Sequence, residues 1–123
     1  MGNGYLMAEW HFYAAGPSKS NDKKRWTTGT AEEKQKIKKS IKVAVDWQKK
    51  TGIYTWVGAW MPGAYNKDDN YSVKEQTEFA SFMTQQLDKH GVPFAINADH
   101  HFYDYKAEQW IPKYKDLLNT IFM

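Results

Sequence analysis

Residues 54–60 (YTWVGAW) decide the fold of this 123-residue chain. The stretch is rich in β-branched and aromatic residues and runs into Pro62-Gly63, so it predicts a strand that ends at a turn. Residues 30–52 before it and 72–91 after it carry the start and stop signals of long helices. A strand between two helices is typical of βα units with parallel strands.

Both predicted helices begin with a capping box, Thr30-Ala31-Glu32-Glu33 in the first and Ser72-Val73-Lys74-Glu75 in the second. Gly52 ends the first helix as a left-handed residue, and His90-Gly91 ends the second. Apolar residues at helical spacing predict one inward stripe on each helix. The stripes are Ile37, Ile41, Ala44, Val45 and Gln48, and then Phe79, Ala80, Met83 and Leu87.

Two further strands are predicted at residues 5–13 and 93–98. A last helix is expected from Ala107 or Pro112 to the C-terminus, with Leu117, Leu118 and Ile121 facing inward. No glycine-rich turn that could hold a phosphate follows any strand, which argues against a nucleotide-binding fold. We therefore predict one α/β domain over residues 1–123, a partial TIM-type (β/α) barrel of three parallel βα units. The alternative is a small three-stranded α/β sheet, but strands that end in polar or aromatic residues favour the barrel.

The composition excludes several classes of site. The chain has no cysteine, so it has no disulfide, thiolate zinc site, iron–sulfur cluster or cysteine nucleophile. Its net charge is +3, and the largest group of lysines falls on the first helix among Glu32, Glu33 and Asp46, which is typical of a solvated face rather than a nucleic-acid site. No apolar run approaches the roughly 20 residues of a membrane span, and Met1-Gly2-Asn3-Gly4 does not resemble a signal peptide. No cofactor is predicted.

Polar side chains alternate along the first strand, where Glu9, His11 and Tyr13 share one face. A carboxylate inside an apolar strand is costly unless it is paired or used, so Glu9 is a candidate catalytic or sugar-binding group. It is equally expected as a structural group bonded to His11, Lys19 or a loop N–H. With Asp99 from the third strand, Glu9, His11 and Tyr13 form the predicted catalytic set.

Four residues near the second and third strand ends are predicted to bind substrate: Trp60, Asn97, His101 and Tyr103. Aromatic rings at strand ends suit stacking on sugar rings, although Trp60 could instead plug the barrel. Trp47 and Trp110 are expected to lie in helices as packing residues.

A metal-dependent hydrolase is a further alternative, because Glu9, His11, Asp99 and His101 have side chains of the ligand type. No His-x-His or His-Glu-x-x-His pair strengthens it, and no metal site is predicted.

Residues 6–13, Gly16-Pro17-Ser18 and residues 56–63 resemble the C-terminal part of glycoside hydrolase family 5, the cellulase family. The resemblance implies strands six to eight of an eight-stranded barrel, action on β-1,4-glucan and secretion. His11 and Tyr13 match the family's His-x-Tyr, which lines the subsite where the bond is cut.

Two departures concern the family's catalytic glutamates. Ala59 stands at the position of the nucleophile, and the strand that carries the general acid/base is not in this chain. A retaining glycosidase needs two carboxyl groups about 5–5.5 Å apart, so Glu9 with Asp99 is the replacement pair that the chain offers. The predicted function is therefore a cellulase-type hydrolase, and the alternative is a non-catalytic carbohydrate-binding fragment.

Three βα units form an open arc with two unpaired parallel edges and one uncovered sheet face. Such edges and faces favour association with another chain. The sequence therefore predicts a homo-oligomer in which a second copy completes the sheet.

Overall fold

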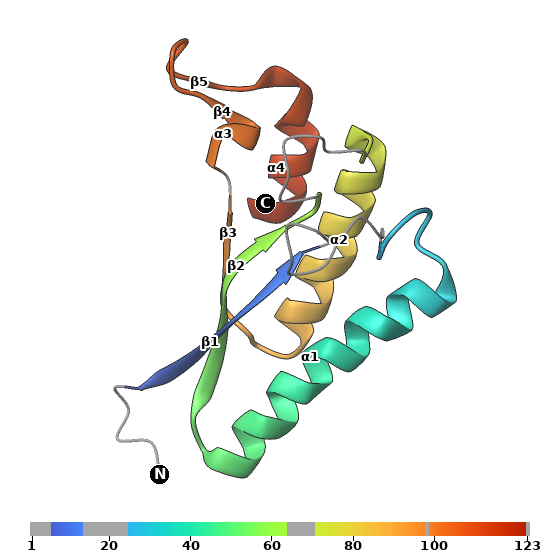
Figure 1. Ribbon diagram of the computed structural model, residues 1–123, viewed down its shortest axis with the longest axis vertical. Helices are drawn as coiled ribbons and strands as arrows, with labels where there is room; N and C mark the ends of the chain where they lie inside the picture. Colours follow the sequence, from blue (N-terminus) through green and yellow to red (C-terminus); the bar gives the residue numbers. More distant parts are fainter. Residues whose placement is uncertain (1–5, 14–24, 64–70, 98, 123) are drawn as a thin grey trace.

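The computed structural model describes residues 6–13, 25–63, 71–97 and 99–122. Its centre is a parallel sheet of three strands in the order β1-β2-β3, with bounds Met7–Tyr13, Tyr54–Met61 and Phe94–Ile96. Helix α1 (Ala31–Thr51) lies between β1 and β2 in sequence, and α2 (Val73–Lys89) lies between β2 and β3. Both helices lie on the same side of the sheet (Figure 1). The predicted order of alternating strands and helices is confirmed over this part of the chain.

The C-terminal part differs from the prediction. After β3 comes the short helix α3 (Asp99–Phe102), and then an antiparallel hairpin of β4 (Tyr103–Asp104) and β5 (Gln109–Trp110). A 3₁₀ turn, η1 (Pro112–Tyr114), leads into α4 (Lys115–Phe122), which packs beside α2 (Figure 1). The last helix thus begins after Pro112 rather than at Ala107, and Trp110 lies in a strand.

The helix ends form as their sequences predict. The Thr30 hydroxyl accepts from the N–H of Glu33, while the Glu33 carboxylate accepts from the N–H of Thr30. Ser72 and Glu75 make the same reciprocal pair at the start of α2. Gly52 follows α1 with φ of 74°, a left-handed conformation that suits glycine, and its N–H donates to the carbonyl of Gln48.

Aromatic rings fill the core between the sheet and the helices. Phe79 on α2 is fully buried, and its ring lies 5.6 Å from Trp26 and 6.1 Å from both Phe12 and Trp60, measured between centroids. Trp26 comes from the segment before α1 and is also buried. The predicted stripes of α1 and α2 line the same core, with Ile37, Ile41, Val45, Phe79, Ala80, Met83 and Leu87 all buried.

One extra residue interrupts the pairing of β1 with β2. Trp10 pairs with Val57, but the next residue of β1, His11, pairs with Ala59, so Gly58 has no partner in β1. This is a β-bulge, in which two residues of one strand oppose one residue of the other. The bulge changes the alternation of β2. As a result, Val57 and Trp60 are both buried on the same side although they are three residues apart.

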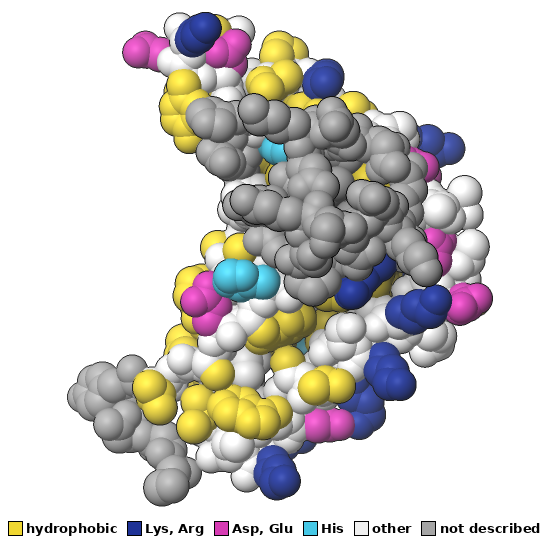
Figure 2. All heavy atoms as spheres, in the orientation of Figure 1, with side chains coloured by type: hydrophobic (Ala, Val, Ile, Leu, Met, Phe, Trp, Pro, Cys, Tyr) yellow, Lys and Arg dark blue, Asp and Glu magenta, His cyan; other side chains and the backbone are white. Residues whose placement is uncertain are grey.

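Charged side chains lie mainly on the outer, helical side of the molecule (Figure 2). On α1 they form pairs one turn apart, Lys36 with Glu32 at 3.0 Å and Lys42 with Asp46. Such a balanced face fits a solvated helix. Within the described ranges, no helix is long and apolar enough to cross a membrane.

The cap of α1 predicts a pH dependence of stability. Burial alone would raise the pKa of Glu33, but hydrogen bonds from Thr30 and Thr27 outweigh it and lower the pKa below its ordinary value. A carboxyl group with a lower pKa in the folded state stabilises the fold above its ordinary pKa, and this stability is lost as the pH falls through the folded pKa. We expect Glu33→Gln to cost about 0.3–1 kcal/mol at pH 7 and less with increasing acidity.

Urea unfolding at pH 7 and at stepwise lower pH measures this difference. Glu32→Gln is the matched control, since Glu32 lies in the same turn but pairs with Lys36 rather than with the cap. A penalty for Glu33→Gln that stays constant down to pH 3 would contradict the assignment.

Candidate functional site

Glu9 and His11 form a pair on the face of the sheet that the helices leave open. His11 Nε2 lies 2.8 Å from Glu9 Oε1, and each side chain is 48% exposed. Their neighbour Phe12 faces the other way and is buried against Phe79, as strand alternation requires. The molecule is hollowed on the side away from its helices (Figure 2). The structure therefore confirms that Glu9 and His11 share a face, and it pairs them.

Gly58, the extra residue of the bulge, provides the space in which the Glu9 side chain lies. A Cβ atom at position 58 would come closer than 3.0 Å to the Oε1, Cδ and Cγ atoms of Glu9. The Glu9 side chain thus leans from β1 toward Gly58 of β2, and its carboxylate meets the His11 ring there. An ionised carboxylate only accepts hydrogen bonds, so His11 Nε2 is the donor of the pair.

Trp60 is not a sugar platform in this structure. It is 0% exposed and packs against Phe79 and Phe94 on the helical side, with centroids 6.1 and 5.8 Å away. The bulge is the reason, because it turns Trp60 toward the helices. Trp56 takes the open face instead. Trp56 pairs with Glu9 and is half-buried, while its sequence neighbours Thr55 and Val57 are buried on the opposite, helical side of the sheet.

Three other predicted residues follow β3. Asn97 is half-buried, and its N–H donates to the carbonyl of Trp60 at 2.8 Å, which fixes the chain where it leaves the sheet. His101 is half-buried beside Phe102, with ring centroids 5.9 Å apart. Tyr103 packs between Tyr105 and Trp110 at 5.2 Å from each, in a small aromatic cluster on the hairpin.

The side chains of Tyr13 and Asp99 lie outside the described part of the chain, so their predicted roles stay predictions. The backbone of Tyr13 ends β1 beside Met61, and Asp99 begins α3. Since β2 lies between β1 and β3, the predicted site residues on β1 and those that follow β3 are separated by two strand spacings, about 10 Å. No cluster of three or more His, Asp or Glu side chains occurs among the residues described, so the metal alternative finds no ligand set there.

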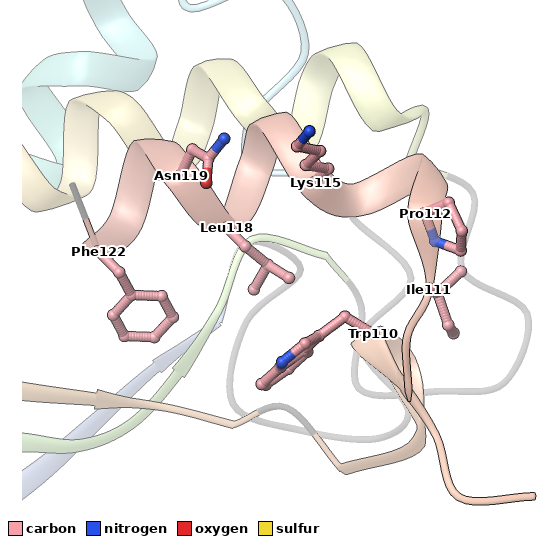
Figure 3. A pocket seen from close by; sticks show the side chains of 7 residues that line it. All are labelled: Trp110, Ile111, Pro112, Lys115, Leu118, Asn119 and Phe122. Atoms are coloured by element: carbon pink, nitrogen blue, oxygen red, sulfur yellow. The ribbon is translucent and has the colours of Figure 1, made fainter. Parts of the chain in front are cut away.

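A cavity of about 380 Å³ lies away from this pair, between the hairpin and α4 (Figure 3). Its lining is mostly apolar and consists of Trp110, Ile111, Pro112, Lys115, Leu118, Asn119 and Phe122. Trp110 is 53% exposed here, which corrects the expectation that it packs within a helix. Trp47, on the outer face of α1, is also exposed rather than packed.

Solved structures of other proteins share this fold. The chain superposes on the cellulose synthase subunit Z of Clostridioides difficile with a TM-score of 0.72 over 95% of its length, at 15% identity. It superposes on an endoglucanase of Thermotoga maritima with a TM-score of 0.71 over 94% of its length, at 19% identity. The chain has the fold of part of a TIM-barrel enzyme. It spans only 40% and 38% of these two structures.

A broad-specificity endoglucanase from Clostridium longisporum gives a TM-score of 0.69 at 16% identity, over 94% of this chain and 34% of that one. No family model and no curated protein matches the sequence. At these identities the comparisons establish the fold alone.

Proposed function

We propose that this chain is part of a cellulase-type glycoside hydrolase that acts on β-1,4-glucan. The observation that carries the proposal is the Glu9–His11 pair, which lies next to Trp56 on the open face of a partial barrel. A carboxylate, an imidazole and an indole ring together supply hydrogen-bond acceptors, donors and a flat apolar surface, which is what a pyranose ring needs. Solved structures of this fold include endoglucanases.

In this proposal Glu9, His11, Tyr13 and Asp99 lie at the bond that is cut. Asp99 supplies the second carboxyl group that glycoside hydrolysis requires. Asn97, His101 and Tyr103 contact the glucan chain beyond that bond. Trp56, rather than Trp60, stacks on a sugar ring. Because a glucan polymer is too large to enter a cell, the proposal places the protein outside it.

A second candidate is glucan binding without hydrolysis. Two observations favour it: Ala59, at the position that resembles the family's nucleophile, pairs with His11, and the oxygen Oε1 of Glu9 is engaged by that histidine. Neither feature prevents a sugar ring from lying on the open face.

The experiment measures binding and turnover on the same preparation. We expect cellotetraose to bind in calorimetry, with an affinity that falls at least about tenfold in Glu9→Ala, since a hydrogen bond to a charged group contributes about 1.5–3 kcal/mol. Reducing-sugar release from carboxymethyl-cellulose that disappears in Glu9→Ala supports hydrolysis. Binding without release identifies the second candidate, and absence of binding rejects both.

A second copy of this chain is the proposed partner at the sheet edges. Strands β1 and β3 end the sheet, and the large apolar side chains of Met7, Tyr54, Trp47 and Phe122 are exposed. Unpaired edges and exposed apolar surface favour association. We expect sedimentation at micromolar concentration to show dimers or larger assemblies, and a compact monomer would contradict this expectation.

A further inference from the structure

We infer that Gly58 is a positioning residue that holds the carboxylate of Glu9 against His11, and that no other residue type at position 58 permits this pair. The inference rests on the proposed function, because it concerns the same open face. Gly58 itself presents no side chain to a ligand, so it acts only through Glu9.

Space, not backbone conformation, is what requires glycine here. Gly58 is not among the residues with positive φ, so an alanine could adopt its backbone angles without strain. A methyl group at this position would instead overlap the Cγ, Cδ and Oε1 atoms of Glu9. Since Glu9 is half exposed and flexible, its side chain would turn away and the fold would remain.

The bulge explains why this space exists. Gly58 is the unpaired residue between the Trp10–Val57 and His11–Ala59 pairs, so its Cα faces β1 at the level between Trp10 and His11. A paired residue of β2 would place its own side chain next to the side chain of its partner in β1. Gly58 is unpaired and has no side chain, so a space of about one side chain remains above it, and the Glu9 carboxylate fills this space.

The consequence for the site is a fixed imidazole. His11 donates through Nε2 to Glu9, so this contact fixes the tautomer and the orientation of the ring. A carboxylate that orients a histidine in this way is a recurrent arrangement in enzyme sites. Gly58→Ala is expected to release the ring by moving the carboxylate.

The test is a double-mutant cycle on the full chain with Gly58→Ala, Glu9→Ala and both together. We expect each single variant to weaken cellotetraose binding about tenfold, and the double variant to bind within twofold of Glu9→Ala, because Gly58 acts through Glu9. The ¹⁵N resonance of His11 Nε2 should move to the same new position in all three. Glu9→Gln, which keeps an acceptor oxygen, should leave this resonance near its original position.

Two results would overturn the inference: a His11 Nε2 resonance that Gly58→Ala leaves unchanged, or losses of affinity that add in the double variant. Thermal unfolding of every variant separates these effects from damage to the fold. If the unsubstituted chain binds no cellotetraose, the proposed function fails, while the resonance of His11 still decides whether Gly58 positions Glu9.

Discussion

Replacing Phe79 by alanine should unfold much of this protein at room temperature. The ring is fully buried and contacts Phe12, Trp26 and Trp60, which come from three different segments of the chain. Truncation of a buried phenylalanine costs about 3–5 kcal/mol, which is a large share of the roughly 5–15 kcal/mol that stabilises an ordinary domain. Urea unfolding followed by tryptophan fluorescence measures the loss directly.

Phe122→Ala is the matched control. Phe122 is 62% exposed on α4, so the same change of side chain should alter the free energy of unfolding by less than about 0.5 kcal/mol. Equal losses in the two variants would show that the aromatic core described here does not stabilise the fold.

The two tryptophans of β2 should respond in opposite ways. Trp60→Ala removes a fully buried indole and is expected to cost about 3–5 kcal/mol of stability. Trp56→Ala removes a half-buried ring from the open face next to Glu9 and is expected to cost little stability. If Trp56 is the sugar platform, its loss should weaken cellotetraose binding about tenfold, which is about 1.4 kcal/mol.

Calorimetry with cellotetraose and thermal unfolding, both run on each variant, separate the two roles. Trp56→Phe is the conservative control, because it retains a flat aromatic surface and should recover part of the affinity. A folded Trp60→Ala variant that binds cellotetraose more weakly, beside a Trp56→Ala variant that binds normally, would reverse the assignment of the two rings.

The long elements were predictable because their signals are periodic. Capping boxes fixed the starts of α1 and α2, and the apolar stripes identified their buried faces, including Ile37 and Phe79. The hairpin of β4 and β5 was not predictable in this way, since strands of two residues are too short to show alternation. Its turn depends on the Asp104 carboxylate, which accepts from the N–H groups of Lys106 and Ala107.

The site was predictable only as far as alternation holds. Glu9 and His11 lie two residues apart on a regular stretch of β1, and their shared face followed from the sequence. The same rule applied to β2 puts Trp56 and Trp60 on one face, but the bulge at Gly58 separates them. A glycine inside a strand is a known sign of a bulge or a close approach, and at Gly58 the structure shows both.

The bulge also makes the chain sensitive to a change of length at a single point. Deleting Gly58 would restore strict alternation in β2 and leave Val57 and Trp60 two residues apart, so Trp60 would still face Phe79, but the gap that holds the Glu9 carboxylate would close. Lengthening the same point by one residue would displace the ends of β2 and β3 relative to β1. Natural insertions and deletions should therefore be tolerated far less at this position than in the hairpin.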